Sequence, residues 1–166
     1  MFGNKTIGFI GAGNIAEAII KGILSARLVP PSRVIASDKD AGKLASLAEK
    51  HEIRVMSNNS SLIEGSDVVI IAIKPSDMEE ALAETAKDFD REKLLISVAA
   101  GKRTKYIEDA IIRGGLKTPP PIIRAMPNTP ALVGAGATGI FAGEGATKDD
   151  LDIACKIFSS IGEVVV

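Results

Sequence analysis

The chain has 166 residues, of which 46% are hydrophobic and 25% are charged, and its 20 basic side chains nearly balance its 21 acidic ones. This length and composition are typical of one globular domain with a sizeable core. The balanced charge argues against a nucleic-acid-binding protein, and the lack of any run of roughly 20 apolar residues argues against a membrane-spanning one.

A single cysteine and a single histidine limit the chemistry open to the chain. Cys155 cannot form an internal disulfide, and its place in a helical apolar pattern predicts core packing. We interpret His51 as a solvated helix terminus rather than a catalytic group. No metal site or hydrolase triad is therefore expected. The first apolar run is short and broken by Gly8 and Gly11, so we expect no secretion signal and a cytoplasmic protein.

Short β-rich runs alternate with helical patterns along the chain, which is typical of an α/β protein with a mostly parallel sheet covered by helices on both faces. The predicted strands are Thr6–Ile10, Val34–Ser37, Arg54–Met56, Val68–Ile73, Leu94–Val98, Ile122–Met126, Ala137–Phe141 and Glu163–Val166. The predicted helices are Asn14–Ala26, Ala41–His51, Asn59–Glu64, Ser76–Ala86, Thr104–Arg113 and Lys148–Ser160.

Local signals support several of these boundaries. Ser76 with Glu79, and Thr147 with Asp150, have the spacing of a capping box at a helix start. The pair Gly114-Gly115 predicts the end of the fifth helix.

A glycine-rich turn joins the first strand to the first helix, with the pattern Gly11-x-Gly13-x-x-Ala16. In this context Gly11 permits a tight turn, Gly13 lets a pyrophosphate approach the backbone, and Ala16 lets the helix pack closely on the strand. The free N–H groups at the helix start favour phosphate. We therefore predict a Rossmann-type doubly wound fold that forms one dinucleotide-binding domain over residues 1–166. The predicted cofactor contacts here are Ile10, Gly11, Ala12, Gly13, Asn14 and Ile15.

Together with this turn, a Met-Pro-Asn-Thr-Pro motif in residues 124–133 closely resembles the pyrroline-5-carboxylate reductase family. Two further blocks, Ala72–Pro75 and Ser97–Gly101, fit the same family at the corresponding places. The resemblance implies reduction of the cyclic imine 1-pyrroline-5-carboxylate to L-proline by a nicotinamide cofactor. It also implies a helical second domain that anchors the substrate and forms a homodimer or higher homo-oligomer.

The turn after the second strand bears on the choice of cofactor. An acidic residue such as Asp38 favours the free ribose of NADH, whereas a cation such as Lys39 suits the 2′-phosphate of NADPH. The family resemblance implies that Ser37 and Lys39 contact NADPH and that Asn59 lies near the adenine. We therefore favour NADPH over NADH, although Asp38 departs from the family pattern.

The ends of the fourth and fifth strands are predicted to face the nicotinamide half of the cofactor. The resemblance assigns Ala72, Ile73, Lys74 and Pro75 to this region, with Lys74 near the ribose. Small residues around Ala100 leave room for a planar ring. Asn128, within the motif, either offers an amide to the substrate or holds a turn between two prolines, and the sequence does not separate these alternatives.

No side chain in the chain is assigned a catalytic role, because hydride transfer to a protonated imine needs orientation more than acid–base chemistry. The chain ends in the strand Glu163–Val166, where the family's second domain would begin. We therefore expect a fragment or truncated form that binds cofactor but turns over poorly. Two alternatives stay open: another two-domain dehydrogenase, such as a hydroxyacid dehydrogenase or an F420-linked NADP reductase, and a non-catalytic dinucleotide-binding regulatory module.

Overall fold

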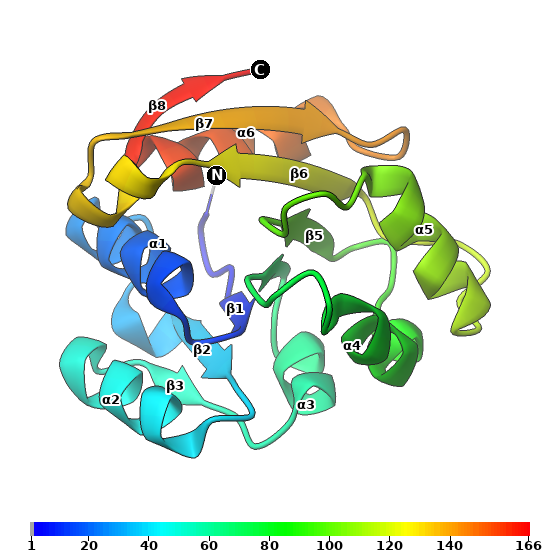
Figure 1. Cartoon of the computed structure of the whole chain (residues 1–166), viewed down its shortest axis with the longest axis horizontal. Helices are drawn as coiled ribbons and strands as arrows, with labels where there is room; N and C mark the ends of the chain where they lie inside the picture. Colours follow the sequence, from blue (N-terminus) through cyan, green and yellow to red (C-terminus); the bar gives the residue numbers. More distant parts are fainter. Residues whose placement is uncertain (1) are drawn as a thin grey trace.

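The computed structural model describes residues 2–166, which form one eight-stranded sheet in the order β3-β2-β1-β4-β5-β6-β7-β8 (Figure 1). The strands are β1 (Ile7–Ile10), β2 (Val34–Ser37), β3 (Arg54–Val55), β4 (Val68–Ile71), β5 (Leu94–Ser97), β6 (Ile122–Pro127), β7 (Gly136–Ala142) and β8 (Gly162–Val165). The α-helices are α1 (Asn14–Ser25), α2 (Ala41–His51), α3 (Asn59–Glu64), α4 (Met78–Thr85), α5 (Thr104–Arg113) and α6 (Lys148–Ser159). Three short 3-10 helices are η1 (Pro31–Arg33), η2 (Ala86–Asp88) and η3 (Thr129–Val133).

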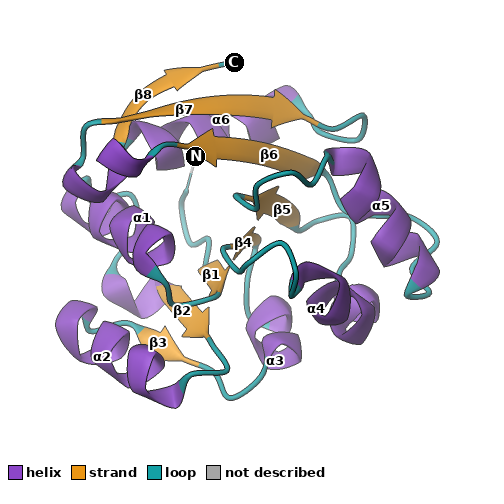
Figure 2. Cartoon of the chain, viewed as in Figure 1, coloured by secondary structure: helices purple, strands orange, loops and turns teal. Residues whose placement is uncertain are grey.

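Helices cover both faces of the sheet, as Figure 2 shows by colour. One hydrophobic core packs α1, α2 and α6 against β1, β2 and β6, and it includes the buried side chains of Phe9 and Phe158. A second core packs α3, α4 and α5 against the other face, around Leu62, Leu82 and Ile111. The predicted α/β fold with a mostly parallel sheet is confirmed. Every helix within residues 2–166 is too short or too polar to cross a bilayer.

The order of the strands places a switch point beside β1. From β1 the sheet grows through β2 and β3 on one side and through β4, β5 and β6 on the other, and all these neighbours run parallel. The carboxyl ends of six strands therefore share one edge, which is where open α/β sheets bind ligands. The residues of β1 and β4 are all buried, as expected of central strands covered on both faces.

The last two strands reverse direction. The link from β6 to β7 contains only η3 and its flanking turns, too little for the crossover that a parallel neighbour requires, so β7 returns antiparallel to β6. The helix α6 then provides a crossover, and β8 lies parallel to β7. Residues 127–135 therefore return to the same edge as the carboxyl ends of β1, β4 and β5.

Most predicted boundaries agree with the structure to within one residue, and the end of the fourth strand and the start of the fourth helix differ by more. The capping box of Thr147 and Asp150 at α6 is confirmed, and Gly114 is the C-cap that ends α5, as predicted. The capping box at Ser76 is wrong, because the Asp77 N–H donates to the Lys74 carbonyl at 3.0 Å in a turn, and α4 begins only after that turn. The fourth strand is shorter than the apolar run, since it ends at Ile71.

Gly8 in β1 marks a close approach between the sheet and α3. A Cβ at this position would contact the Ser66 hydroxyl and lie 2.7 Å from Leu62 Cδ2. We expect Gly8→Ala to lower the free energy of unfolding by about 1–3 kcal/mol through overpacking. Urea denaturation measures this loss. Gly145→Ala is the control, because a Cβ at Gly145 meets no heavy atom within 4 Å. Equal stability of the two variants would contradict the packing described.

Candidate functional site

The glycine turn after β1 is held between the ends of β2 and β4. The Gly11 N–H donates to the Ser37 carbonyl at 2.8 Å, and the Ala72 N–H donates to the Ile10 carbonyl at 2.8 Å. Gly11 has φ +109°, and a Cβ there would lie 2.5 Å from the Ala72 carbonyl oxygen. Only glycine fits this combination of left-handed backbone and close neighbours.

The second glycine of the turn, Gly13, borders open space. Gly13 is the N-cap of α1 with extended backbone, no side chain caps the helix, and a Cβ built there meets no heavy atom within 4 Å. The first N–H groups of a helix have no acceptor within the helix. Those of Asn14 and Ile15 therefore face the space above Gly13, which the fingerprint predicts for a pyrophosphate. The local geometry fits the predicted group.

Asp38 has a structural role that the sequence did not indicate. Its Oδ2 accepts from the Ala12 N–H at 2.7 Å, and its Oδ1 accepts from the Asp40 N–H at 2.7 Å. Both carboxylate oxygens are thus engaged with the backbone, and they join the glycine turn to the turn after β2. These two bonds fix the position of the carboxylate, and its remaining lone pairs can still accept hydrogen bonds from ribose hydroxyls.

Two other predicted residues lie together beside this turn. The Ser37 hydroxyl is buried and donates to Asn59 Oδ1 at 2.6 Å. Asn59 is the first residue of α3, so the contact fixes the start of that helix at the end of β2. Lys39, by contrast, is exposed and pairs with Glu80 in the first turn of α4.

A cavity of about 310 Å³ joins the two signature motifs at the carboxyl edge. It is lined by Asn14, Ile15, Val98, Pro127, Asn128, Thr129 and Leu132. The glycine turn and the Met-Pro-Asn-Thr-Pro motif therefore meet across the end of β5, although more than a hundred residues separate them. The Asn128 Oδ1 accepts from the Ala137 N–H at 2.9 Å, which supports the turn-holding alternative for that side chain.

The remaining predicted contacts lie in the turns around this cavity. Ala72 and Ile73 are half-buried after β4, whereas Lys74, Pro75 and Ala100 are exposed on the same edge. Val98 lies in the predicted block Ser97–Gly101, although sequence reasoning did not single it out as a contact. Leu132 was missed, because nothing in the sequence predicted that η3 would place it near α1.

A second cavity, of about 510 Å³, lies between the starts of α1 and α2, and its lining includes Gly13, Asn14, Glu17 and Lys43. Burial tends to raise the pKa of Glu17, but hydrogen bonds from His51 and Lys50 outweigh it and lower that pKa. The His51 ring lies 3.3 Å from Glu17, and its side chain is 15% exposed. The helix-terminus interpretation of His51 is therefore right, but the expected solvation is wrong.

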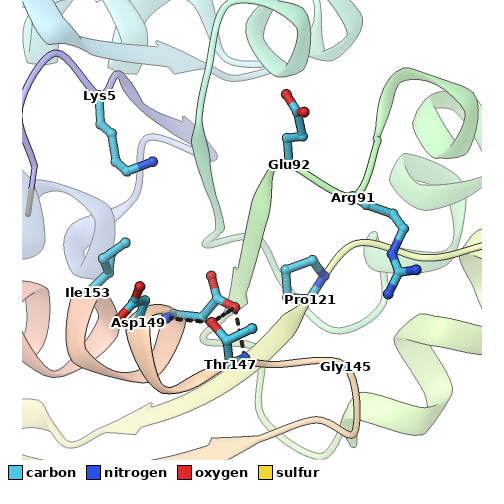
Figure 3. Close-up of a pocket in the computed structure, with 9 residues that line it drawn as sticks. Lys5, Arg91, Glu92, Pro121, Gly145, Thr147, Asp149 and Ile153 are labelled. Carbon is cyan, nitrogen blue, oxygen red and sulfur yellow. Dashed lines mark hydrogen bonds between the residues drawn. The ribbon is translucent and has the colours of Figure 1, made fainter.

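A larger cavity, of about 630 Å³, lies on the opposite edge of the sheet, at the amino ends of β1, β5 and β6 (Figure 3). Its lining mixes the cations Lys5 and Arg91 with three carboxylates, and the capping box engages Asp150 with Thr147. It is distant from the glycine turn and from every predicted cofactor contact. We assign the functional site to the carboxyl edge, because the open helix N-terminus and both motifs lie there. No metal-binding cluster of His, Cys, Asp or Glu occurs within residues 2–166.

Comparison with known proteins identifies relatives of this chain. Residues 6–101 match the family model described as "NADP oxidoreductase coenzyme F420-dependent". A pyrroline-5-carboxylate reductase of Methanosarcina acetivorans is 38% identical over 98% of this chain. The solved structure of a pyrroline-5-carboxylate reductase from Coxiella burnetii has a TM-score of 0.89 and 34% identity over 98% of this chain. A Plasmodium falciparum pyrroline carboxylate reductase with NADP bound has a TM-score of 0.83 and 25% identity, also over 98% of this chain.

These matches confirm the family resemblance inferred from the motifs. They extend over nearly the whole chain, which itself covers 58% of the Methanosarcina protein, 58% of the Coxiella structure and 57% of the Plasmodium structure. The chain therefore spans somewhat more than half the length of the proteins it matches.

Removing the Asp38 carboxylate tests its role as the link between the two turns. Asp38→Ala leaves the N–H of Ala12, which is 8% exposed, without its acceptor. We expect a loss of about 1–3 kcal/mol in the free energy of unfolding, measured by urea denaturation. The exposed Glu49→Ala on α2 removes the same charge and should cost less than about 0.5 kcal/mol. A loss for Asp38→Ala no larger than the control's would show that the carboxylate is not a structural link.

Proposed function

Since this chain belongs to the family described as "NADP oxidoreductase coenzyme F420-dependent", we propose that it is the cofactor-binding domain of a pyrroline-5-carboxylate reductase. The whole enzyme would use NADPH to reduce the cyclic imine 1-pyrroline-5-carboxylate to L-proline in the cytoplasm. The observation that carries this proposal is the cavity in which the glycine turn meets Pro127–Thr129. Its support is the similarity over 98% of the chain to reductases of that name.

Each part of the site has a role in this proposal. The backbone N–H groups of Gly13, Asn14 and Ile15 hold the pyrophosphate, because a helix N-terminus favours negative charge. Ser37 and Asn59 border the adenosine half at the end of β2. The bound cofactor supplies a hydride from its reduced nicotinamide ring.

The cavity itself favours a reaction that depends on orientation. None of its lining side chains is acidic or basic. That composition suits reduction of a protonated imine, whose carbon is already electrophilic and needs no general acid from the protein. Ile15, Val98 and Pro127 then position the two reacting rings and exclude water, so that the reacting atoms approach to roughly 3–3.5 Å.

The substrate carboxylate needs an anchor that this cavity does not provide. No cationic side chain lines it within the described residues. We infer that a helical second domain of the whole enzyme contributes that anchor and the contacts of a homodimer or higher homo-oligomer. Binding energy from the carboxylate would serve to orient the imine carbon, so the two domains would act together in the chemical step.

Gly13→Val tests the cofactor site without a packing penalty. The extended backbone at Gly13 accepts a branched residue, and the space around it is open. The new side chain would occupy the place of the pyrophosphate, so we expect NADPH affinity to fall at least tenfold by calorimetry. Unfolding midpoints should stay close to the parent value. Gly145→Val, at a position that is equally open but lies on the opposite edge, should bind normally, and tight binding by Gly13→Val would contradict the assignment.

A domain fusion tests the division of labour. Residues 1–166 alone should bind NADPH but show little or no turnover of the cyclic imine, followed by NADPH absorbance. Joining the second domain of the Methanosarcina acetivorans relative after residue 166 should restore turnover. Comparable activity of residues 1–166 alone would contradict the proposed anchor. NADPH binding without turnover by the fusion would favour a regulatory module instead.

A further inference from the structure

An ion pair bridges two segments on the adenosine side of the site. Lys39 Nζ lies 2.5 Å from Glu80 Oε2, and the two residues are 41 positions apart in the chain. Lys39 belongs to the turn after β2, and Glu80 to the first turn of α4. The pair therefore spans from the strand end that we predict to meet the adenosine ribose to the helix that follows Ala72–Pro75.

Acidic groups surround this lysine. Its hydrogen bond with Glu80, followed by the charges of Glu80, Asp77 and Glu84, raises the pKa of Lys39. The lysine in turn lowers the pKa of Glu80. The cation is therefore fully charged at neutral pH, and neighbouring carboxylates already balance that charge.

The two acids of the turn itself, Asp38 and Asp40, bond to backbone N–H groups, whereas Glu80 pairs with Lys39. The two oxygens of Asp38 accept hydrogen bonds from the backbone N–H groups of Ala12 and Asp40. Asp40 caps α2 through the N–H groups of Gly42 and Lys43. The exposed carboxylate of Glu80 is thus the acidic group that contacts the lysine of this turn.

We propose that Glu80 sets the preference between NADPH and NADH by competing with the 2′-phosphate for Lys39. This inference rests on the proposed function. A phosphate arriving at Lys39 must displace the Glu80 carboxylate and remain near its negative charge, whereas NADH carries no group that disturbs the pair. Glu80 therefore weakens NADPH binding and leaves NADH binding almost unchanged.

Calorimetric affinities for both cofactors test the proposal directly. Glu80→Gln should tighten NADPH binding about two- to fivefold, as the loss of an exposed charge interaction allows, and should change NADH affinity by less than that. The gain should shrink as ionic strength rises. Glu79→Gln is the matched control, because it removes the same charge from the same helix turn without a contact to Lys39, and it should leave both affinities near the parent values.

The double variant Lys39→Met with Glu80→Gln should lose the gain. Persistence of the gain without Lys39, equal changes for the two cofactors, or no change for NADPH would each overturn the role of Glu80. In these cases the parent protein still binds a cofactor, so the proposed function stands. Failure of the parent protein to bind either cofactor would overturn the proposed function itself and this inference with it.

Discussion

The hydrogen bonds that hold Gly11 between the ends of β2 and β4 determine the rest of the site. Its N–H is bonded to the Ser37 carbonyl, and its α-carbon packs against the Ala72 carbonyl with no room for a side chain. The Asp38 carboxylate adds a second link through the Ala12 N–H. These contacts fix the direction in which the chain leaves β1, so α1 begins above the sheet edge with its free N–H groups turned toward the ligand space.

This constraint also explains how distant motifs meet. Parallel strands bring their carboxyl ends to one edge, and the short link after β6 keeps residues 127–135 at that edge. Asn128 stabilises this return by accepting the Ala137 N–H, and η3 then places Leu132 near α1. The resulting cavity has apolar and neutral polar walls, which fits a reaction that depends on the orientation of two rings.

The sequence predicted the parts of the structure that depend on local pattern. The order of strands and helices follows from segments in which apolar residues recur with the period of a strand or of a helix. The glycine turn follows from the spacing of its glycines between a predicted strand and a predicted helix. The early end of β4 and the late start of α4 were not predicted. A turn closed by a hydrogen bond to the Lys74 carbonyl includes residues whose sequence pattern is typical of a strand end and a helix cap.

Side-chain partners across the fold could not be predicted in the same way. Asp38 and Lys39 are adjacent and opposite in charge, so sequence alone left the cofactor choice divided between them. Ala12, which bonds to Asp38, and Glu80, which pairs with Lys39, come from separate segments that only the folded sheet brings together. The contact between His51 and Glu17 is of the same kind, since it depends on how α2 packs on α1.

The roles of the glycine turn and of the cavity both depend on where a dinucleotide lies on this sheet. A crystal structure of residues 1–166 with NADPH tests that claim most directly. We expect pyrophosphate oxygens within hydrogen-bonding distance of the Asn14 and Ile15 N–H groups, and the nicotinamide ring in the cavity beside Val98 and Pro127. A cofactor bound in the cavity of Lys5 and Arg91, or a pyrophosphate away from the start of α1, would contradict it.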